Sequence, residues 1–219
     1  MDRDTMSYEL DDIINEYNCS SRCDKEYEKV KWGSQEKMEN RFRFVLSELN
    51  ISPGSKVLDV GCGTGGFIKM LLQRFPNVNA TGIDVSDELL KYASDKIANP
   101  DVRLVRSDFL ALTCEKYDFI TCIGVLQKTN MKLSDFFKKA ADCLNSGGKL
   151  FVDTKNINWE MFSKGLTPET THSWFDIEDI FKAGNEAGLK LVSYGGFNPE
   201  TGEKTETDMS HTMYIIMEI

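Results

Sequence analysis

From about residue 56 onward, short apolar runs alternate with amphipathic stretches, which is the pattern of an α/β protein. The aliphatic run Val57–Val60 predicts a buried strand that stops at a glycine-rich turn. Phe67, Leu71 and Phe75 then recur four residues apart and predict a helix, which Pro76 closes. Strand, glycine-rich turn and helix in this order are typical of the first unit of a doubly wound sheet.

Further apolar runs predict the rest of this sheet. The expected strands are Asn79–Asp84, Val102–Phe109, Tyr117–Leu126, a fifth strand entered through Leu144–Val152, and Thr212–Ile219. Between the first two of these, Ser86 is expected to cap a helix that carries Leu89 and Ile97. We therefore expect a single α/β domain over residues 51–219.

The first fifty residues have a different character. Residues 8–17 are weakly amphipathic, and a clearer helix is predicted from Ser34 to Leu49 with Met38, Phe42 and Val45 on its apolar stripe. We expect residues 1–50 to form a helical arm over the edge of the sheet, either as a simple structural cover or as a lid.

The glycine-rich turn satisfies two ligand-binding patterns. Gly61, Gly63 and Gly66 spell G-x-G-x-x-G, the dinucleotide pattern, while Gly61, Gly63 and Gly65 spell G-x-G-x-G. Asp59 lies two residues before the first glycine. A carboxylate there would repel a pyrophosphate at the helix N-terminus, whereas a ligand with an ammonium and a sulfonium would tolerate it.

At these residues the chain resembles the class I S-adenosylmethionine-dependent methyltransferases, whose first motif is an acid followed by x-G-x-G-x-G. The resemblance extends over about residues 50–219. It implies a doubly wound, seven-stranded and mostly parallel sheet with an antiparallel last strand and helices on both faces.

The resemblance also implies the cofactor, S-adenosylmethionine, and the product S-adenosylhomocysteine. Asp59 and the glycines would shape the methionine pocket, Asp84 would bind the ribose hydroxyls, and Asp108 with Phe109 would face the adenine. The full set of expected cofactor-binding residues is Asp59, Gly61, Cys62, Gly63, Gly65, Asp84, Val85, Asp108, Phe109 and Ile123, with Trp32 and Arg41 from the arm.

The acceptor site is expected around the connection of residues 155–174, which shows little periodicity and carries several large rings. Loops that follow parallel strands lie at the carboxyl edge of a sheet, where ligands bind. We expect Trp159 and Trp174 to contact the acceptor. Gln127, after the fourth strand, is expected either to touch the acceptor or only to cap the following turn.

Two histidines occur in the chain, His172 and His211. Both map to the carboxyl edge, because the last strand is expected to run antiparallel and to start there. Each is either a hydrogen-bonded structural residue or a catalytic base, which would raise the rate by about 10²–10⁴.

These features predict methyl transfer to oxygen or nitrogen of a small molecule. After the fourth strand the chain reads Ile123-Gly124-Val125-Leu126-Gln127, which lacks the Asp/Asn-Pro-Pro-Tyr sequence of amide and exocyclic-amine methyltransferases. A peptide or protein acceptor, a non-catalytic S-adenosylmethionine-binding protein and a nicotinamide-dependent oxidoreductase stay open as alternatives.

Charge and composition narrow the partners. The formal net charge is −9 and the basic residues are scattered, which disfavours a nucleic-acid substrate. No apolar run is long enough to span a bilayer, and Met1–Asp4 lacks the apolar core of a signal peptide. The six cysteines have no regular spacing, so we expect free thiols, no metal site and a cytoplasmic protein.

Overall fold

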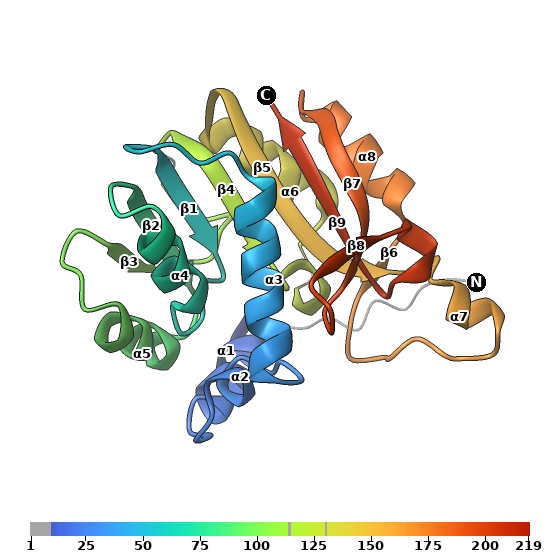
Figure 1. Ribbon diagram of the computed structural model, residues 1–219, viewed down its shortest axis with the longest axis horizontal. Coiled ribbons are helices and arrows are strands. Elements are labelled where there is room, and N and C mark those ends of the chain that lie inside the picture. The colour runs from blue at the N-terminus through green and yellow to red at the C-terminus, as the bar shows by residue number, and fades with distance from the viewer. Residues whose placement is uncertain (1–9, 114, 130) are drawn as a thin grey trace.

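The computed structural model describes residues 10–113, 115–129 and 131–219 (Figure 1). Its α-helices are α1 (Leu10–Ser20), α2 (Glu26–Lys29), α3 (Gln35–Glu48), α4 (Gly66–Arg74), α5 (Asp87–Ile97), α6 (Leu133–Cys143), α7 (Glu160–Ser163) and α8 (Ile177–Glu186). Two short 3₁₀ turns are η1 (Leu126–Lys128) and η2 (Thr207–Met209). Its strands are β1 (Lys56–Val60), β2 (Asn79–Asp84), β3 (Arg103–Arg106), β4 (Tyr117–Ile123), β5 (Leu144–Asn156), β6 (Trp174–Phe175), β7 (Lys190–Asn198), β8 (Glu203–Thr205) and β9 (Thr212–Glu218).

The strands form one sheet in the order β3-β2-β1-β4-β5-β9-β7-β8, with β6 paired to β5. Strands β1 to β5 are parallel, and β9 runs antiparallel between β5 and β7. The predicted fold class and the antiparallel last strand are therefore confirmed. The predicted strand number is wrong, because the described residues contain nine strands in the sheet. The additions are the short β6, inside the expected structureless connection, and β8, which extends the β7 edge.

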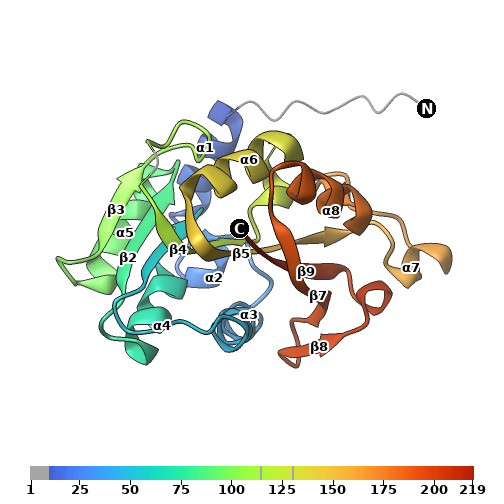
Figure 2. The same ribbon diagram turned by 90° about the horizontal axis from the view of Figure 1, so that it is seen from above.

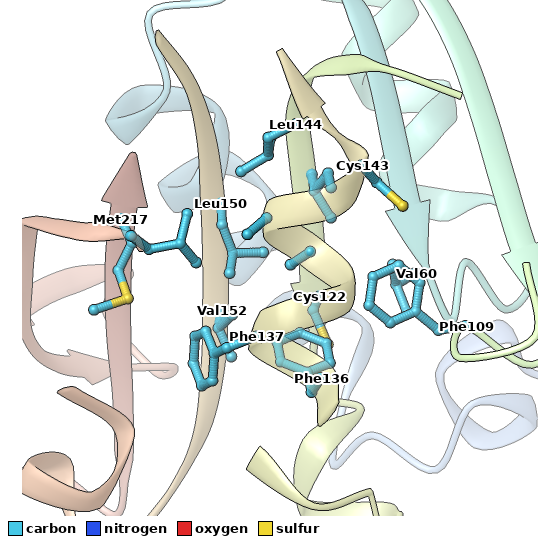
Figure 3. Packing of buried hydrophobic residues seen from close by; sticks show 14 of the residues in the cluster. Val60, Phe109, Cys122, Phe136, Phe137, Cys143, Leu144, Leu150, Val152 and Met217 are labelled. Carbon is cyan, nitrogen blue, oxygen red and sulfur yellow. The ribbon is translucent and has the colours of Figure 1, made fainter. Parts of the chain in front are cut away.

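Helices cover both faces of the sheet. Figure 2 shows α6 and α8 on one face and α3 and α4 on the other. Successive side chains of β5 point to opposite faces of the sheet. Leu150 and Val152 belong to the apolar cluster under α6, and Phe151 belongs to the cluster under α3. Figure 3 shows the first cluster, in which Phe136 and Phe137 of α6 lie against the sheet.

Side-chain caps begin several of these helices, as the sequence predicts. Ser34 accepts a hydrogen bond from the Lys37 amide at the start of α3, and Ser86 accepts one from the Leu89 amide at the start of α5. Each cap satisfies an amide that has no partner within the helix.

The described part of the arm, residues 10–50, contains three helices. Figure 1 shows α1 and α2 beyond the carboxyl ends of β1 and β4, and α3 packed along the sheet. The predicted helix of residues 34–49 is confirmed, and the predicted helix of residues 8–17 corresponds to α1, which continues to Ser20. Residues 8 and 9, and the N-terminal residues on which the absence of a signal peptide was argued, lie outside the described residues.

Cysteine usage differs from the expectation of free thiols, because one disulfide is present. Cys19, Cys23, Cys62 and Cys122 are free thiols, but Cys143 is disulfide-bonded. Within the described ranges, no three His, Cys, Asp or Glu side chains lie close enough to share a metal ion. No helix in this part of the chain has both the length and the apolar character needed to cross a membrane.

Candidate active site

The glycine-rich turn after β1 is a close-packed bend. Gly61, Gly63 and Gly65 all have positive φ, at 69°, 52° and 73°. A Cβ at Gly61 would lie 2.4 Å from Val125, and one at Gly63 would lie 2.8 Å from Val30. Only glycine combines this backbone conformation with so little space.

Two buried carboxylates stabilise this turn. Asp84, at the end of β2, accepts hydrogen bonds from the amides of Gly63 and Ser86, each at 2.9 Å. Asp59, within β1, accepts a hydrogen bond of 2.8 Å from the Thr121 hydroxyl. Burial raises the pKa of both, that of Asp59 to about 7, because the charged form loses its hydration.

A cavity of about 300 Å³ opens at the carboxyl edge of the sheet beside this turn. Its walls come from the ends of β1 to β4 and from the arm. Seven of the predicted cofactor-binding residues besides Trp32 line it: Gly61, Gly63, Asp84, Val85, Asp108, Phe109 and Ile123. The fold therefore brings together predicted residues that are up to 62 positions apart, from Gly61 to Ile123.

Four predicted cofactor-binding residues lie elsewhere. Asp59 and Cys62 line a smaller adjoining pocket of about 40 Å³. Gly65 faces Ala93 and Ile97 of α5, so it serves helix packing. Arg41 lines neither pocket.

The arm forms one wall of the main cavity. Leu10, Ile13 and Tyr17 of α1 line it together with Trp32. Burial raises the pKa of the Tyr17 phenol, and the nearby carboxylates of Glu16 and Asp84 raise it further. Asn18 accepts a hydrogen bond of 2.7 Å from the Ser86 hydroxyl, which ties α1 to the start of α5.

Arg41 of α3 is part of a buried ion pair behind this wall. Its guanidinium lies 4.5 Å from the Trp32 ring centroid, and its Nε lies 3.4 Å from Oδ2 of Asp153. Oδ1 of Asp153 accepts a hydrogen bond of 2.6 Å from the Gly124 amide at the end of β4. The arm, β5 and the cavity wall at Gly124 are thus joined by one chain of contacts.

Both histidines lie at the carboxyl edge, as expected, but neither lines the main cavity. His172 Nδ1 lies 2.9 Å from the Glu169 carboxylate. His211 Nδ1 lies 3.3 Å from the Lys155 ammonium. Burial and, after it, nearby cations together lower the pKa of each to about 4, so both imidazoles are neutral at pH 7.

Of the predicted acceptor residues, Trp159 and Trp174 lie on the connection after β5, and Gln127 lies in η1. Trp159 packs on His211 and Phe162, and Trp174 also packs on Phe162. Gln127 is buried, and its Oε1 has no hydrogen-bond partner in the described part of the chain. Its backbone carbonyl accepts a hydrogen bond of 2.9 Å from Ser173, which fastens the connection to η1.

Sequence reasoning missed four polar residues at this edge: Tyr17, Lys128, Asp153 and Lys155. A signal was present for Asp153, because it follows directly after the apolar run Leu150–Val152 in the same strand. A carboxylate in such a strand requires a buried partner. The partner, Arg41, lies more than a hundred residues away, and no local pattern identifies it.

Comparisons with known proteins agree with this geometry. The family model described as "Methyltransferase domain" matches residues 57–148. The S-adenosylmethionine-dependent methyltransferase UmaA of Mycobacterium tuberculosis is 28% identical over 206 residues, covering 86% of this chain and 70% of the relative. The ubiquinone biosynthesis O-methyltransferase of Coxiella burnetii is 25% identical over 191 residues, covering 80% of each.

A solved structure shares the fold. The S-adenosylmethionine-dependent methyltransferase of Clostridium acetobutylicum ATCC 824 superposes with a TM-score of 0.67 at 17% identity, over 88% of this chain and 96% of that one.

Proposed function

The chain belongs to the class I S-adenosylmethionine-dependent methyltransferases, and on this premise we propose that it methylates an oxygen or nitrogen atom of a small molecule. The observation that carries the proposal is the 300 Å³ cavity at the carboxyl edge, which the helical arm closes on one side. The relative from Coxiella burnetii is by name an O-methyltransferase, which supports an oxygen acceptor as one of the two choices.

The cavity residues suit S-adenosylmethionine, the cofactor of this family. Gly61 and Gly63 line the cavity with backbone in a bend that a side chain could not adopt, and the walls beside them are mainly apolar. Asp84 offers carboxylate oxygens to ribose hydroxyls, while Asp108 and Phe109 would meet the adenine. Asp59 lies beside the glycine-rich turn, where its ionised form would repel the pyrophosphate of a dinucleotide.

When bound, the cofactor supplies a sulfonium-activated methyl group for in-line displacement. The residues of this chain would contribute position and enclosure. Holding an acceptor in line with a methyl group is worth about 7–11 kcal/mol. Tyr17 and Trp32 would exclude water from the cavity, which suits a reaction in which charge disperses. In this proposal residues 1–50 act as a lid on the domain of residues 51–219.

The two histidines would have different roles. A carboxylate only accepts hydrogen bonds, so the contact with Glu169 requires the proton of neutral His172 on Nδ1 and leaves Nε2 free to accept another. An ammonium only donates, so the contact with Lys155 requires the proton of neutral His211 on Nε2. We therefore favour His172 as the base and His211 as a hydrogen-bond donor to the acceptor.

Calorimetric titration with S-adenosylhomocysteine tests the cofactor site, with NAD as the control ligand. We expect micromolar binding of S-adenosylhomocysteine and no heat from NAD. Binding of NAD alone would overturn the proposal. Methyl transfer from radiolabelled S-adenosylmethionine to a panel of phenols, amines and peptides then tests the acceptor class, and labelling of peptides alone would contradict a small-molecule acceptor.

A further inference from the structure

Five side chains at the carboxyl edge form a closed circuit of contacts, which we call the Lys155 cluster. It consists of Lys155, His211, Trp159, Phe162 and Trp174. The Lys155 ammonium lies 3.3 Å from His211 Nδ1 and 5.4 Å from the centroid of the Trp174 ring. The rings continue from His211 to Trp159 at 5.4 Å, to Phe162 at 5.5 Å and to Trp174 at 4.9 Å between centroids.

The position of this cluster is next to the proposed methyl-donor cavity. Lys155 lies near the end of β5, where it pairs with Thr212 at the start of β9. The backbone amide of Ser173, directly before Trp174, donates a hydrogen bond to the Gln127 carbonyl, which holds this segment against η1. The next residue of η1, Lys128, lines the cavity itself.

Within the described residues, Lys128 and Lys155 have no carboxylate in direct contact. Glu16 and Glu169 attract Lys128, and Glu169 and Asp153 attract Lys155, only at longer range. No salt bridge joins either ammonium to a carboxylate within residues 10–113, 115–129 and 131–219. Asp153 is engaged by Arg41, and Glu169 lies against His172 with 66% of its side chain exposed. This is notable in a chain with a net charge of −9, where carboxylates are abundant.

Both lysines are also partly removed from water. Burial and the nearby Arg41 together lower the pKa of Lys155 to about 8, and burial also lowers the pKa of Lys128. Removing an ammonium from water without a counter-charge costs free energy, and a bound anion would offset that cost. The neutral His211, with its proton on Nε2, adds a further donor in the same place.

We propose that the methyl acceptor carries an anionic group, a carboxylate or a phosphate, and that this group binds to the ammonium groups of Lys155 and Lys128 while its apolar body lies on Trp159 and Trp174. The inference rests on the proposed function, since it names the class of acceptor for the same site.

The test uses three ring compounds of similar shape: benzoate, phenyl phosphate and the uncharged benzamide. Each is titrated into the full chain while tryptophan fluorescence is recorded, because Trp159 and Trp174 lie in the cluster. We expect saturable binding of benzoate, phenyl phosphate or both, and at least about tenfold weaker binding of benzamide. Benzoate alone would indicate a carboxylate acceptor, and phenyl phosphate alone a phosphate acceptor.

Matched variants separate the cluster from general charge. Lys155→Met and Lys128→Met should each weaken anion binding by about tenfold. Lys164→Met removes the same charge from an exposed position of the same connection, where the lysine pairs with Glu160, and should leave binding unchanged. Equal binding of benzamide and the anions, no saturable binding of either anion, or equal effects of the Lys155 and Lys164 substitutions would overturn the proposal.

Titration of each variant with S-adenosylhomocysteine confirms that it is folded and keeps the two proposals apart. Wild-type protein that binds benzoate but not S-adenosylhomocysteine would refute the proposed function and leave the anion site. Protein that binds S-adenosylhomocysteine but no anion would refute the anion site and leave the proposed function.

Discussion

At the scale of single residues, Gly61 shows how tightly the turn after β1 is constrained. Gly61→Ala would place a methyl group 2.4 Å from Val125 at a φ of 69°. We expect it to cost about 1–3 kcal/mol of stability and to weaken S-adenosylhomocysteine binding, measured by urea unfolding and calorimetry. Gly147→Ala is the matched control, because Gly147 has a φ of 72° with nothing within 4 Å of its Cβ. Equal loss of binding in both variants would show that the contact with Val125 has no role.

Asp84 has two roles, one in the glycine-rich turn and one in the cavity wall. It accepts hydrogen bonds from the Gly63 and Ser86 amides, and it faces the cavity. Asp84→Ala should weaken S-adenosylhomocysteine binding by about 1.5–3 kcal/mol, the scale of a hydrogen bond to a charged group. Asp87→Ala, at an exposed position three residues later, should leave the affinity unchanged. Unaltered affinity in the Asp84 variant would refute its role.

The lowered pKa of His211 makes stability depend on pH. The unfolded chain binds a proton at this residue below about pH 6.5, whereas the folded chain resists it down to about pH 4, because burial, Lys155 and Arg41 oppose the charge more strongly than a backbone hydrogen bond and Glu169 favour it. Stability is therefore present above pH 6.5 and is lost as the pH falls toward 4.

His211→Gln removes this titration. The difference in unfolding free energy between wild type and variant should decrease by about 1–3 kcal/mol from pH 7 to pH 4, measured by urea unfolding across that range. If the difference in unfolding free energy does not change with pH, His211 has the same pKa in the folded and the unfolded chain.

At the scale of elements, the Arg41–Asp153 pair joins α3 to β5. Arg41→Met would leave a buried carboxylate unpaired and should cost about 3–5 kcal/mol. Adding Asp153→Asn should restore part of that loss, because the unpaired charge is removed. Arg43→Met on the same helix is the control: Arg43 is exposed and pairs with Glu39, so its loss should cost below about 1 kcal/mol. Equal costs for the two arginines in urea unfolding would contradict a buried ion pair.

The sequence predicted elements better than it predicted contacts between them. Periodicity and caps located α3, α4 and α5, since each depends on residues close along the chain. The short β6 was missed because two residues give no periodic signal, and its strand conformation comes from pairing with Lys155 and Asn156 of β5.

The candidate site follows the same rule. Gly61, Gly63, Asp84 and Asp108 were predicted because the chain resembles a known family at these motifs, and each lies at or shortly after the end of a strand, which places it at the carboxyl edge. Lys155 and its rings depend on how a connection folds back on the sheet. That arrangement is set by tertiary packing, which no spacing in the sequence reveals.

At the scale of the whole molecule, one edge of the sheet carries two neighbouring sites. The proposed methyl-donor cavity lies over β1 to β4, and the Lys155 cluster lies over β5 and β9. The arm contributes to the first through α1 and reaches the second through Arg41, whose NH2 group donates to Thr212 at 3.3 Å. Because the arm forms one wall of the cavity, we expect ligand binding there to protect the arm more than other segments of the chain.

Ligand-dependent protection tests this coupling. A ligand at one hundred times its dissociation constant stabilises the folded state by about 2.7 kcal/mol, which for a chain of this size raises Tm by about 5–10 °C. If the arm acts as a lid, S-adenosylhomocysteine should also slow tryptic cleavage after Arg22 and Lys25, which are exposed between α1 and α2. Cleavage after Lys164, exposed at the end of α7, is the internal control and should change less, because α7 does not line the cavity. A rise in Tm with unchanged cleavage at Arg22 and Lys25 would show that the ligand binds while the arm remains a static cover.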